Sequence, residues 1–186
     1  MKAVLISIRP KWVELIASGK KTIEVRKTAP EIKTPFKCYI YCTKDPGNKG
    51  SATHFFESDE GTFWSAGKTF AAFLSGTVIG EFTCDSIHKI INVGNAFVAG
   101  KSVTETILMA HASCLDFGDM HDYLGHKGGY GWHISDLKIY NQPRKLSEFR
   151  KPLYCHRGNE RENCTGCWDC EIKRPPQSWC YVEEMT

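Results

Sequence analysis

The chain has 186 residues, of which 41% are hydrophobic, and a formal net charge of +3. This length suits one ordinary domain with a sizeable core and a small appendage, and it leaves little room for two full domains. No apolar run approaches the roughly 18 residues of a membrane span, and the run in "MKAVLISIRPKW" is too short for a secretory signal. We therefore expect a cytoplasmic protein with no membrane partner.

The charge is distributed unevenly along the chain. Residues 1–44 contain ten Lys or Arg and three Asp or Glu, whereas residues 45–136 contain five and eleven, and residues 137–186 contain nine and seven. The basic excess of the first segment suits a polyanionic partner. A solvated surface is the commoner cause of such a charge run taken alone.

The first part of the chain predicts a strand, a helix and a second strand in succession. The run "AVLISI" over 3–8 has strand length, and "KWVELIAS" has apolar residues at helical spacing. Pro10 suits a first helical position, and Gly19 suits the residue after the helix. "TIEVR" over 22–26 then has the β-branched composition of a strand.

Side chains of a strand point alternately to opposite faces. In the predicted strand, Glu24 and Arg26 are therefore expected on one face, and Ile23 and Val25 on the other. Lys21 lies where the chain enters this strand.

The rest of the chain predicts further strands and two helices. These are strands over 36–43, 76–87 and 129–140, helices over 103–113 and 117–124, and a last strand in "RPPQSWCYVEE" that docks Trp179 and Tyr181. Residues 44–75 begin with a turn-rich, charged stretch and are predicted to be an insertion. Several strands, few helices and long connections favour an α+β fold, specifically a small β-barrel with short helices at its rim.

Nine cysteines are many for a cytoplasmic protein, and their odd number argues against a disulfide framework. Four are scattered among apolar residues and are predicted to be small core side chains: Cys38, Cys42, Cys84 and Cys114. The other five crowd the last 32 residues with the spacing C-x8-C-x2-C-x2-C-x9-C.

The close C-x2-C steps have the reach of a zinc knuckle. The predicted ligands are Cys155, Cys164, Cys167 and Cys170, with Cys180 or His156 as substitutes. The segment has too few apolar side chains to fold by burial alone, which favours a structural zinc over the alternative of reduced, unbound thiols. We therefore divide the chain into a domain over 1–150 and a cysteine-rich appendage over 151–186 that packs back on the barrel.

The spacing Gly19-x-Lys21-x-x-Glu24-x-Arg26, placed after a strand and a short helix, resembles the GxKxxExR signature of the ASCH domain family, part of the PUA-like superfold. Later segments such as "GTVIGEFTCDSI" also resemble those of phage-associated and bacterial ASCH proteins. The resemblance implies a barrel with a cleft beside the first helix, and a role in recognising RNA or a modified nucleotide. It leaves the oligomeric state open.

Residue chemistry agrees with this implied ligand. Cationic side chains neutralise phosphate, a carboxylate accepts hydrogen bonds from a base edge, and aromatic rings stack on bases. The predicted ligand-binding residues are Arg9, Lys21, Glu24, Arg26, Tyr130, Trp132 and His133. The alternatives are an exposed structural ion-pair network for the charged residues, core packing for Trp12 and the other aromatics, and a purely structural histidine.

A hydrolase, either a nucleoside amidohydrolase or a ribonuclease, is an alternative function of the same cleft. One branch of ASCH proteins acts on N4-acetylcytidine with a threonine nucleophile at the position of Glu24, and a carboxylate does not replace that hydroxyl. Thr22 is out of phase with the cleft. Catalysis would instead use Glu24 as a general base and Lys21 as oxyanion stabiliser.

Other groups and another class of function also remain open. Asp119, His121 and Asp122 are candidates for a further carboxylate or imidazole near the cleft. The third function considered is a protein-interaction module of a phage or host regulatory complex, with the cysteine-rich tail as its contact.

Overall fold

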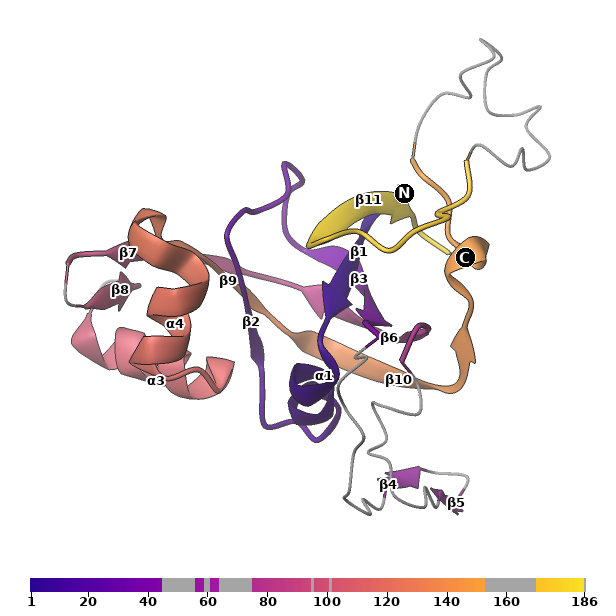
Figure 1. Ribbon diagram of the computed structural model, residues 1–186, viewed down its shortest axis with the longest axis horizontal. Coiled ribbons are helices and arrows are strands. Elements are labelled where there is room, and N and C mark those ends of the chain that lie inside the picture. The colour runs from indigo at the N-terminus through magenta and orange to yellow at the C-terminus, as the bar shows by residue number, and fades with distance from the viewer. Residues whose placement is uncertain are drawn as a thin grey trace, which may run out of the picture. The chain divides into compact units, whose positions relative to one another are not determined.

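The computed structural model describes residues 1–44, 56–58, 61–63, 75–94, 96–100, 102–152 and 170–185 (Figure 1). Its elements are β1 (Lys2–Ile8), α1 (Pro10–Ala17), β2 (Ile23–Arg26), β3 (Phe36–Cys42), β4 (Phe56–Ser58), β5 (Gly61–Phe63), β6 (Val78–Cys84), β7 (Ile87–Asn92), β8 (Phe97–Ala99), α3 (Val103–Ser113), α4 (Phe117–Leu124), η1 (Gly125–Lys127), β9 (Gly129–His133), β10 (Ser135–Arg144), η2 (Leu146–Glu148) and β11 (Trp179–Glu183). No described helix has the length and apolar character that crossing a membrane requires.

The chain divides into two compact units. The first unit comprises Met1–Glu14, Lys37–Glu81 and Lys138–Thr186, and the second comprises Leu15–Phe36 and Phe82–Leu137. Each unit is built mainly on its own sheet.

The first unit is built on a five-stranded sheet with the strand order β10-β6-β3-β1-β11. β1 runs parallel to β3 and antiparallel to β11. Since β1 and β3 are interior strands, their side chains are buried on both faces, which explains the nearly continuous apolar run of β1.

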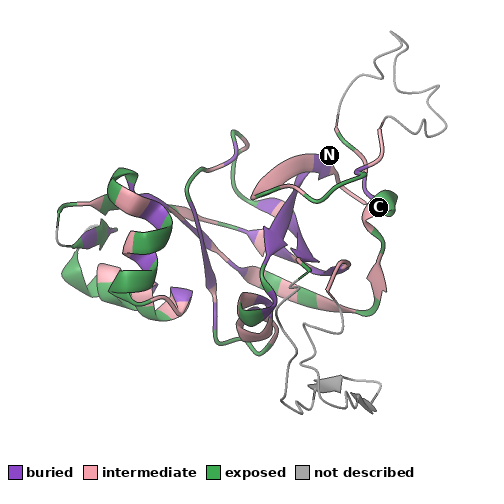
Figure 2. Cartoon of the chain, in the orientation of Figure 1, coloured by how far each residue is buried: buried purple, intermediate pink, exposed green. Residues whose placement is uncertain are grey.

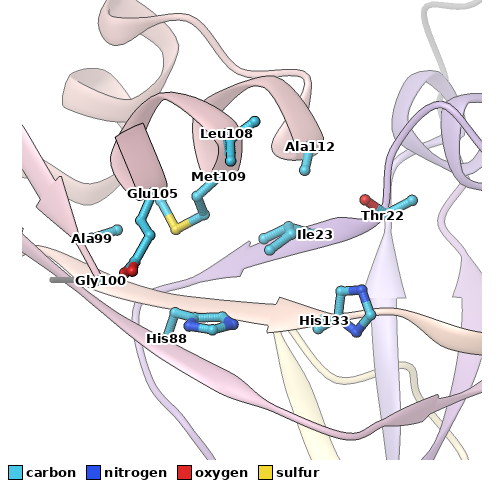
Figure 3. A pocket seen from close by; sticks show the side chains of 10 residues that line it. All are labelled: Thr22, Ile23, His88, Ala99, Gly100, Glu105, Leu108, Met109, Ala112 and His133. Atoms are coloured by element: carbon cyan, nitrogen blue, oxygen red, sulfur yellow. The ribbon is translucent and has the colours of Figure 1, made fainter. Parts of the chain in front are cut away.

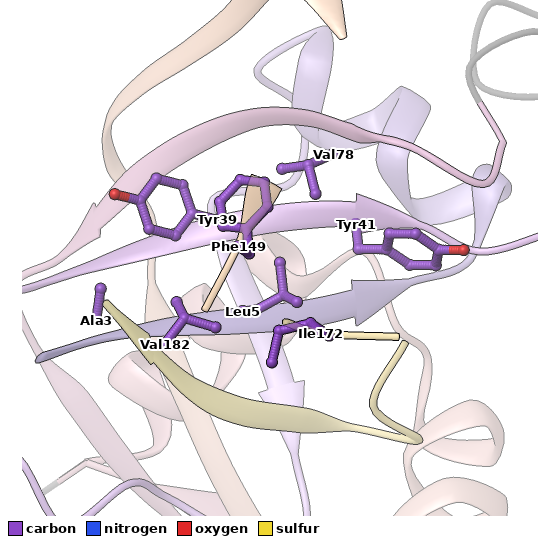
Figure 4. Close-up of a cluster of buried hydrophobic side chains, with 8 residues drawn as sticks. All are labelled: Ala3, Leu5, Tyr39, Tyr41, Val78, Phe149, Ile172 and Val182. Atoms are coloured by element: carbon purple, nitrogen blue, oxygen red, sulfur yellow. The ribbon is translucent and has the colours of Figure 1, made fainter. Parts of the chain in front are cut away.

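One face of this sheet carries a core of side chains that are distant in sequence (Figure 4). Its buried members are Ala3, Leu5, Tyr39, Tyr41, Val78, Phe149, Ile172 and Val182. Tyr39 and Phe149 meet edge to face with ring centroids 4.9 Å apart, and the Tyr39 hydroxyl accepts a 2.7 Å hydrogen bond from the Met185 amide. Described residues near the C-terminus are thus part of the core.

The second unit is built on a four-stranded sheet with the order β2-β9-β7-β8. Helices α3 and α4 contribute Met109, Met120 and Leu124 to an apolar cluster with one face of this sheet. That face includes Ile23 and Val25 of β2, and Figure 2 shows β2 buried along its whole length. The predicted alternation of this strand is confirmed.

Local signals fix the helix ends. α1 begins at Pro10, and Gly19 follows it with a φ of +71°, in the left-handed region that glycine tolerates. The Ser102 side chain accepts from the Glu105 amide at the start of α3, and Cys114 closes that helix in the left-handed conformation. Both helices agree with the sequence predictions.

Two parts of the fold prediction differ from the structure. The mixed α+β content is confirmed, but the described strands form separate sheets of five, four and two strands and show no closed barrel. The single strand predicted over 129–140 is two strands, β9 and β10, in different sheets. Asp136, with a φ of +48°, lies at the start of β10 and turns the chain there. Most of the predicted insertion over 44–75 lies outside the described residues.

The docking of β11 predicts a graded effect of valine truncation on stability. Val182 is fully buried in β11, whereas the Val103 side chain is 76% exposed. Val182→Ala is expected to lower the free energy of unfolding by about 2 kcal/mol because it removes buried methyl groups and leaves a cavity. Val103→Ala, the matched control, changes it by less than about 0.5 kcal/mol. Urea denaturation measures both, and equal effects would contradict the packing of β11 in the core.

Candidate functional site

The residues of the GxKxxExR pattern gather in the second unit at the start of β2. Lys21, Glu24 and Arg26 are 2%, 5% and 6% exposed, so all three are buried. They therefore differ from the exposed ion-pair network considered as their structural alternative. Burial of charged groups is costly unless they are paired, so their contacts decide what the cluster is.

Lys21 is held by the C-terminal end of helix α3. Its Nζ donates a 2.6 Å hydrogen bond to the carbonyl oxygen of Ser113 and lies 3.4 Å from Glu24 Oε2. A cation at this end of a helix interacts favourably with the helix dipole and with carbonyls that have no partner inside the helix. Its backbone is also fixed, because the Lys21 amide donates to the carbonyl oxygen of Leu15.

Glu24 bridges the two cations. Its Oε1 lies 2.8 Å from Arg26 Nη2, while its Oε2 faces Lys21. Glu24 and Arg26 are neighbours because residues two apart in a strand share a face. Both carboxylate oxygens are thus in ion pairs. The arrangement therefore best supports a role for Glu24 in orienting the side chains of Lys21 and Arg26.

The cluster carries an excess positive charge. Two cations share Glu24, which is the one buried carboxylate among the described residues. Burial of charged groups costs solvation free energy, and clusters of buried ionisable groups concentrate at functional sites. The cluster is therefore suited to an anionic ligand.

Aromatic residues of β9 lie on the same face of the sheet. The register pairs Glu24 with Trp132 and Arg26 with Tyr130. Trp132 is fully buried and meets Phe36 edge to face with centroids 6.0 Å apart, so it is a core side chain. Tyr130 is half-buried.

Lys89 extends this row of side chains and was missed by sequence reasoning. β7 pairs with the other edge of β9, and its register places Lys89 opposite Tyr130. The three strands thus carry Arg26, Tyr130 and Lys89 side by side, with Lys89 exposed. The isoleucine-rich run "IHKIIN" has the composition of a strand, but only strand pairing shows which residues it meets.

His133 lies apart from the charged cluster. The register pairs it with Ile23, so it is on the face that α3 covers. Its Nδ1 lies 2.7 Å from Asp85 Oδ1, and both side chains are partly exposed. Partial burial raises the pKa of Asp85, but the hydrogen bond and charge of His133 outweigh it and hold that pKa below its ordinary value.

The remaining predicted residues are elsewhere in the chain. Arg9 is an exposed residue of the first unit, between β1 and α1. Asp119, His121 and Asp122 are on α4, where Asp119 donates its amide to the Asp116 side chain at the helix start. The structure therefore brings together Lys21, Glu24 and Arg26, with Tyr130 and Trp132 beside them.

The proposed zinc ligands fall largely outside the described residues: Cys155, Cys164, Cys167 and His156. Cys170 and Cys180 are described as half-buried thiols, and burial raises the pKa of Cys180 to about 11 despite the nearby Lys151. Within the described parts of the chain, no three His, Cys, Asp or Glu side chains gather to hold a metal. Cys38, Cys42 and Cys84 are buried, as predicted, whereas Cys114, also predicted to be a core side chain, is only partly buried at the end of α3.

Comparison with known proteins places the fold. Residues 6–58 match the family model of the ASCH domain. Among solved structures, the chain is similar to ASCH from Zymomonas mobilis, with 19% identity, a TM-score of 0.55, and coverage of 98% of this chain and 88% of that one. Two mutants of that protein give TM-scores of 0.54 and 0.53 at the same identity, covering 98% and 99% of this chain and 89% and 92% of theirs. No curated protein matches the chain.

The bridging role of Glu24 predicts a large effect of removing its charge. Glu24→Gln keeps the shape of the side chain but removes the carboxylate charge that both buried cations face. We expect the free energy of unfolding to fall by about 3–5 kcal/mol, the range for breaking a buried pair. The control is Glu31→Gln at an exposed position, and chemical denaturation compares the two. If Glu24→Gln lowers the free energy of unfolding no more than Glu31→Gln does, water screens the charges of the cluster.

The pairing of Asp85 with His133 predicts that removing the imidazole changes the pKa of the Asp85 carboxyl. Because His133 lowers the pKa of the Asp85 carboxyl, His133→Ala is expected to raise it toward or above its ordinary value. NMR titration of side-chain carboxyl carbons measures this shift, with the exposed Asp122 as the internal reference. An unchanged Asp85 pKa would mean that the pair is not formed in solution.

Proposed function

We propose that this chain, whose residues 6–58 match the ASCH domain model, binds RNA or a modified nucleotide on the sheet face where exposed Lys89 and half-buried Tyr130 lie beside buried Arg26. The family resemblance implies a ligand of this class, and the excess positive charge of the buried cluster supports it. The single observation that carries the proposal is the burial of Lys21 and Arg26 with one carboxylate between them.

The buried cluster supports anion binding through position and charge. Lys21 and Glu24 neutralise one another, and Lys21 also caps helix α3. Arg26 adds the second positive charge, and its guanidinium is fixed by the 2.8 Å contact with Glu24. A fixed guanidinium loses less conformational entropy when a phosphate approaches, and it presents donors in a planar fork that matches phosphate oxygens.

The neighbouring side chains supply the accessible part of the surface. Tyr130 is half-buried and is flanked across the strands by Arg26 and Lys89. An aromatic ring between two cations suits an unstacked base with a phosphate on either side, since stacking contributes about 1–3 kcal/mol per base. Bases in a duplex are already stacked, so the arrangement favours single-stranded RNA.

The hydrolase alternative gains no support from the geometry of Glu24. A general base needs an oxygen within reach of the proton that it removes. Both oxygens of Glu24 face cations, and Lys21 Nζ is held by the Ser113 carbonyl oxygen. RNA binding without turnover is therefore the function that these contacts favour.

Fluorescence anisotropy with labelled single-stranded RNA tests the proposal. We expect salt-dependent binding, and Lys89→Gln should reduce the slope of log affinity against log salt by about 0.7, the value for one phosphate contact on a single strand. Tyr130→Ala should weaken binding by about 1–3 kcal/mol, whereas Tyr130→Phe should retain the affinity because it keeps the ring.

The matched control is Lys127→Gln, at an exposed position on η1. This substitution changes the net charge by the same amount as Lys89→Gln, but at a residue outside the row of Arg26, Tyr130 and Lys89. Equal losses of RNA affinity for Lys89→Gln and Lys127→Gln would indicate unspecific electrostatic attraction. If the wild-type protein shows no salt-dependent binding, RNA is rejected as the ligand.

A further inference from the structure

The other face of the four-stranded sheet contains a groove of about 280 Å³ between β-strand residues and helix α3. Figure 3 shows its polar side chains, Thr22, His88, Glu105 and His133, around an apolar wall that includes Ile23 and Met109. The groove and its lining lie entirely within the second unit. None of the cationic residues of the proposed RNA-binding face lines it.

His133 is oriented for proton transfer at the edge of this groove. Asp85 Oδ1 lies 2.7 Å from its Nδ1, and a carboxylate can only accept, so Nδ1–H is the donor. The neutral ring then carries its lone pair on Nε2. The backbone is also fixed, because the His133 amide donates to the carbonyl oxygen of Ser86. Asp85 thus sets the tautomer, as the carboxylate does in a carboxylate–histidine pair.

A second imidazole lies on the same face. The register pairs His88 with Gly131, two residues before His133 in β9, which makes the two histidines diagonal neighbours across adjacent strands. Figure 3 shows both rings on the floor of the groove. The His88 Nε2 lies 3.3 Å from the Ser86 hydroxyl. Two imidazoles in one groove supply a base and a hydrogen-bond donor together.

The lining indicates an uncharged substrate. Among the described residues that line the groove there is no Lys or Arg, so the described lining offers no cation to an anion such as a phosphodiester. Ile23, Leu108 and Met109 offer apolar contacts. A groove with an apolar wall and a few polar groups is the usual form of a small-molecule site.

We propose that this groove hydrolyses small, neutral carboxylic esters, with His133 as general base and His88 as hydrogen-bond donor to the oxyanion. Water attacks the acyl carbon while its proton passes to His133 Nε2, giving a tetrahedral intermediate whose oxyanion accepts from an imidazole N–H of His88. The intermediate breaks its bond to the alkoxy oxygen, which takes the proton from His133. The products are a carboxylic acid and an alcohol, and Asp85 acts as a positioning residue.

Hydrolysis of p-nitrophenyl acetate and p-nitrophenyl butyrate by the full chain tests the proposal. His133→Gln should lower kcat by about 100-fold or more, the contribution of a positioned general base. Asp85→Asn should lower kcat with little change in KM, and Asp85→Glu should recover part of the loss, which a purely structural role would not predict. His88→Gln should lower kcat as well. Free imidazole should restore turnover by His133→Gly.

The matched control is His126→Gln, because His126 is an exposed histidine on η1 outside the groove. It should leave turnover unchanged. The proposal is overturned if the wild-type protein is no faster than the same concentration of free imidazole, or if His126→Gln and His133→Gln lose equally. Cleavage of bis(p-nitrophenyl) phosphate in preference to the esters would overturn the substrate class. None of these outcomes depends on RNA binding, so the two proposals fail separately.

Discussion

The pairing of three buried charges at the start of β2 is the constraint on which the second unit depends. Glu24 reaches both Lys21 and Arg26, and Lys21 in turn reaches the last carbonyl of α3. The strand is thereby tied to the end of a helix 92 positions later in the sequence. A register slip of one residue would send Glu24 into the apolar cluster and Ile23 to the side of the charged cluster, so burial of both faces specifies the register strongly.

The same alternation separates two kinds of chemistry on one sheet. Odd-numbered residues of β9 point to the helix side, where glycines leave room for α3 and His133 borders the groove. The even-numbered residues Tyr130 and Trp132 point to the side of the charged cluster. At Gly131 a β-carbon would lie 3.0 Å from Ile23 and 3.2 Å from Met109, so a side chain there would require these neighbours to shift. A single strand therefore shapes both candidate sites.

Local features of this fold were predictable from the sequence, and distant pairings were not. Pro10, Gly19 and apolar spacing located α1, and the composition of 22–26 predicted both the strand and its two faces. The turn at Asp136 has no comparable signal, because its positive φ is imposed where β9 and β10 enter different sheets. The Lys89–Tyr130 neighbours and the Asp85–His133 pair likewise depend on register between segments over 40 residues apart, which one sequence does not reveal.

Interaction with the end of α3 explains why Lys21 and its partner Glu24 are buried, but it does not explain Arg26. Lys21 and Glu24 form an ion pair, and Lys21 donates to the last carbonyl of α3, while the Thr22 amide donates to the carbonyl oxygen of Ala112. Arg26 then adds a buried positive charge, which lowers stability unless something offsets its desolvation. Its guanidinium contacts the same carboxylate, Glu24, that faces Lys21. An anionic ligand would add a counter-charge, and Arg26 lies beside the half-buried Tyr130, in the row that reaches exposed Lys89. Arg26 thus connects the buried cluster to the row of side chains that is best placed for binding.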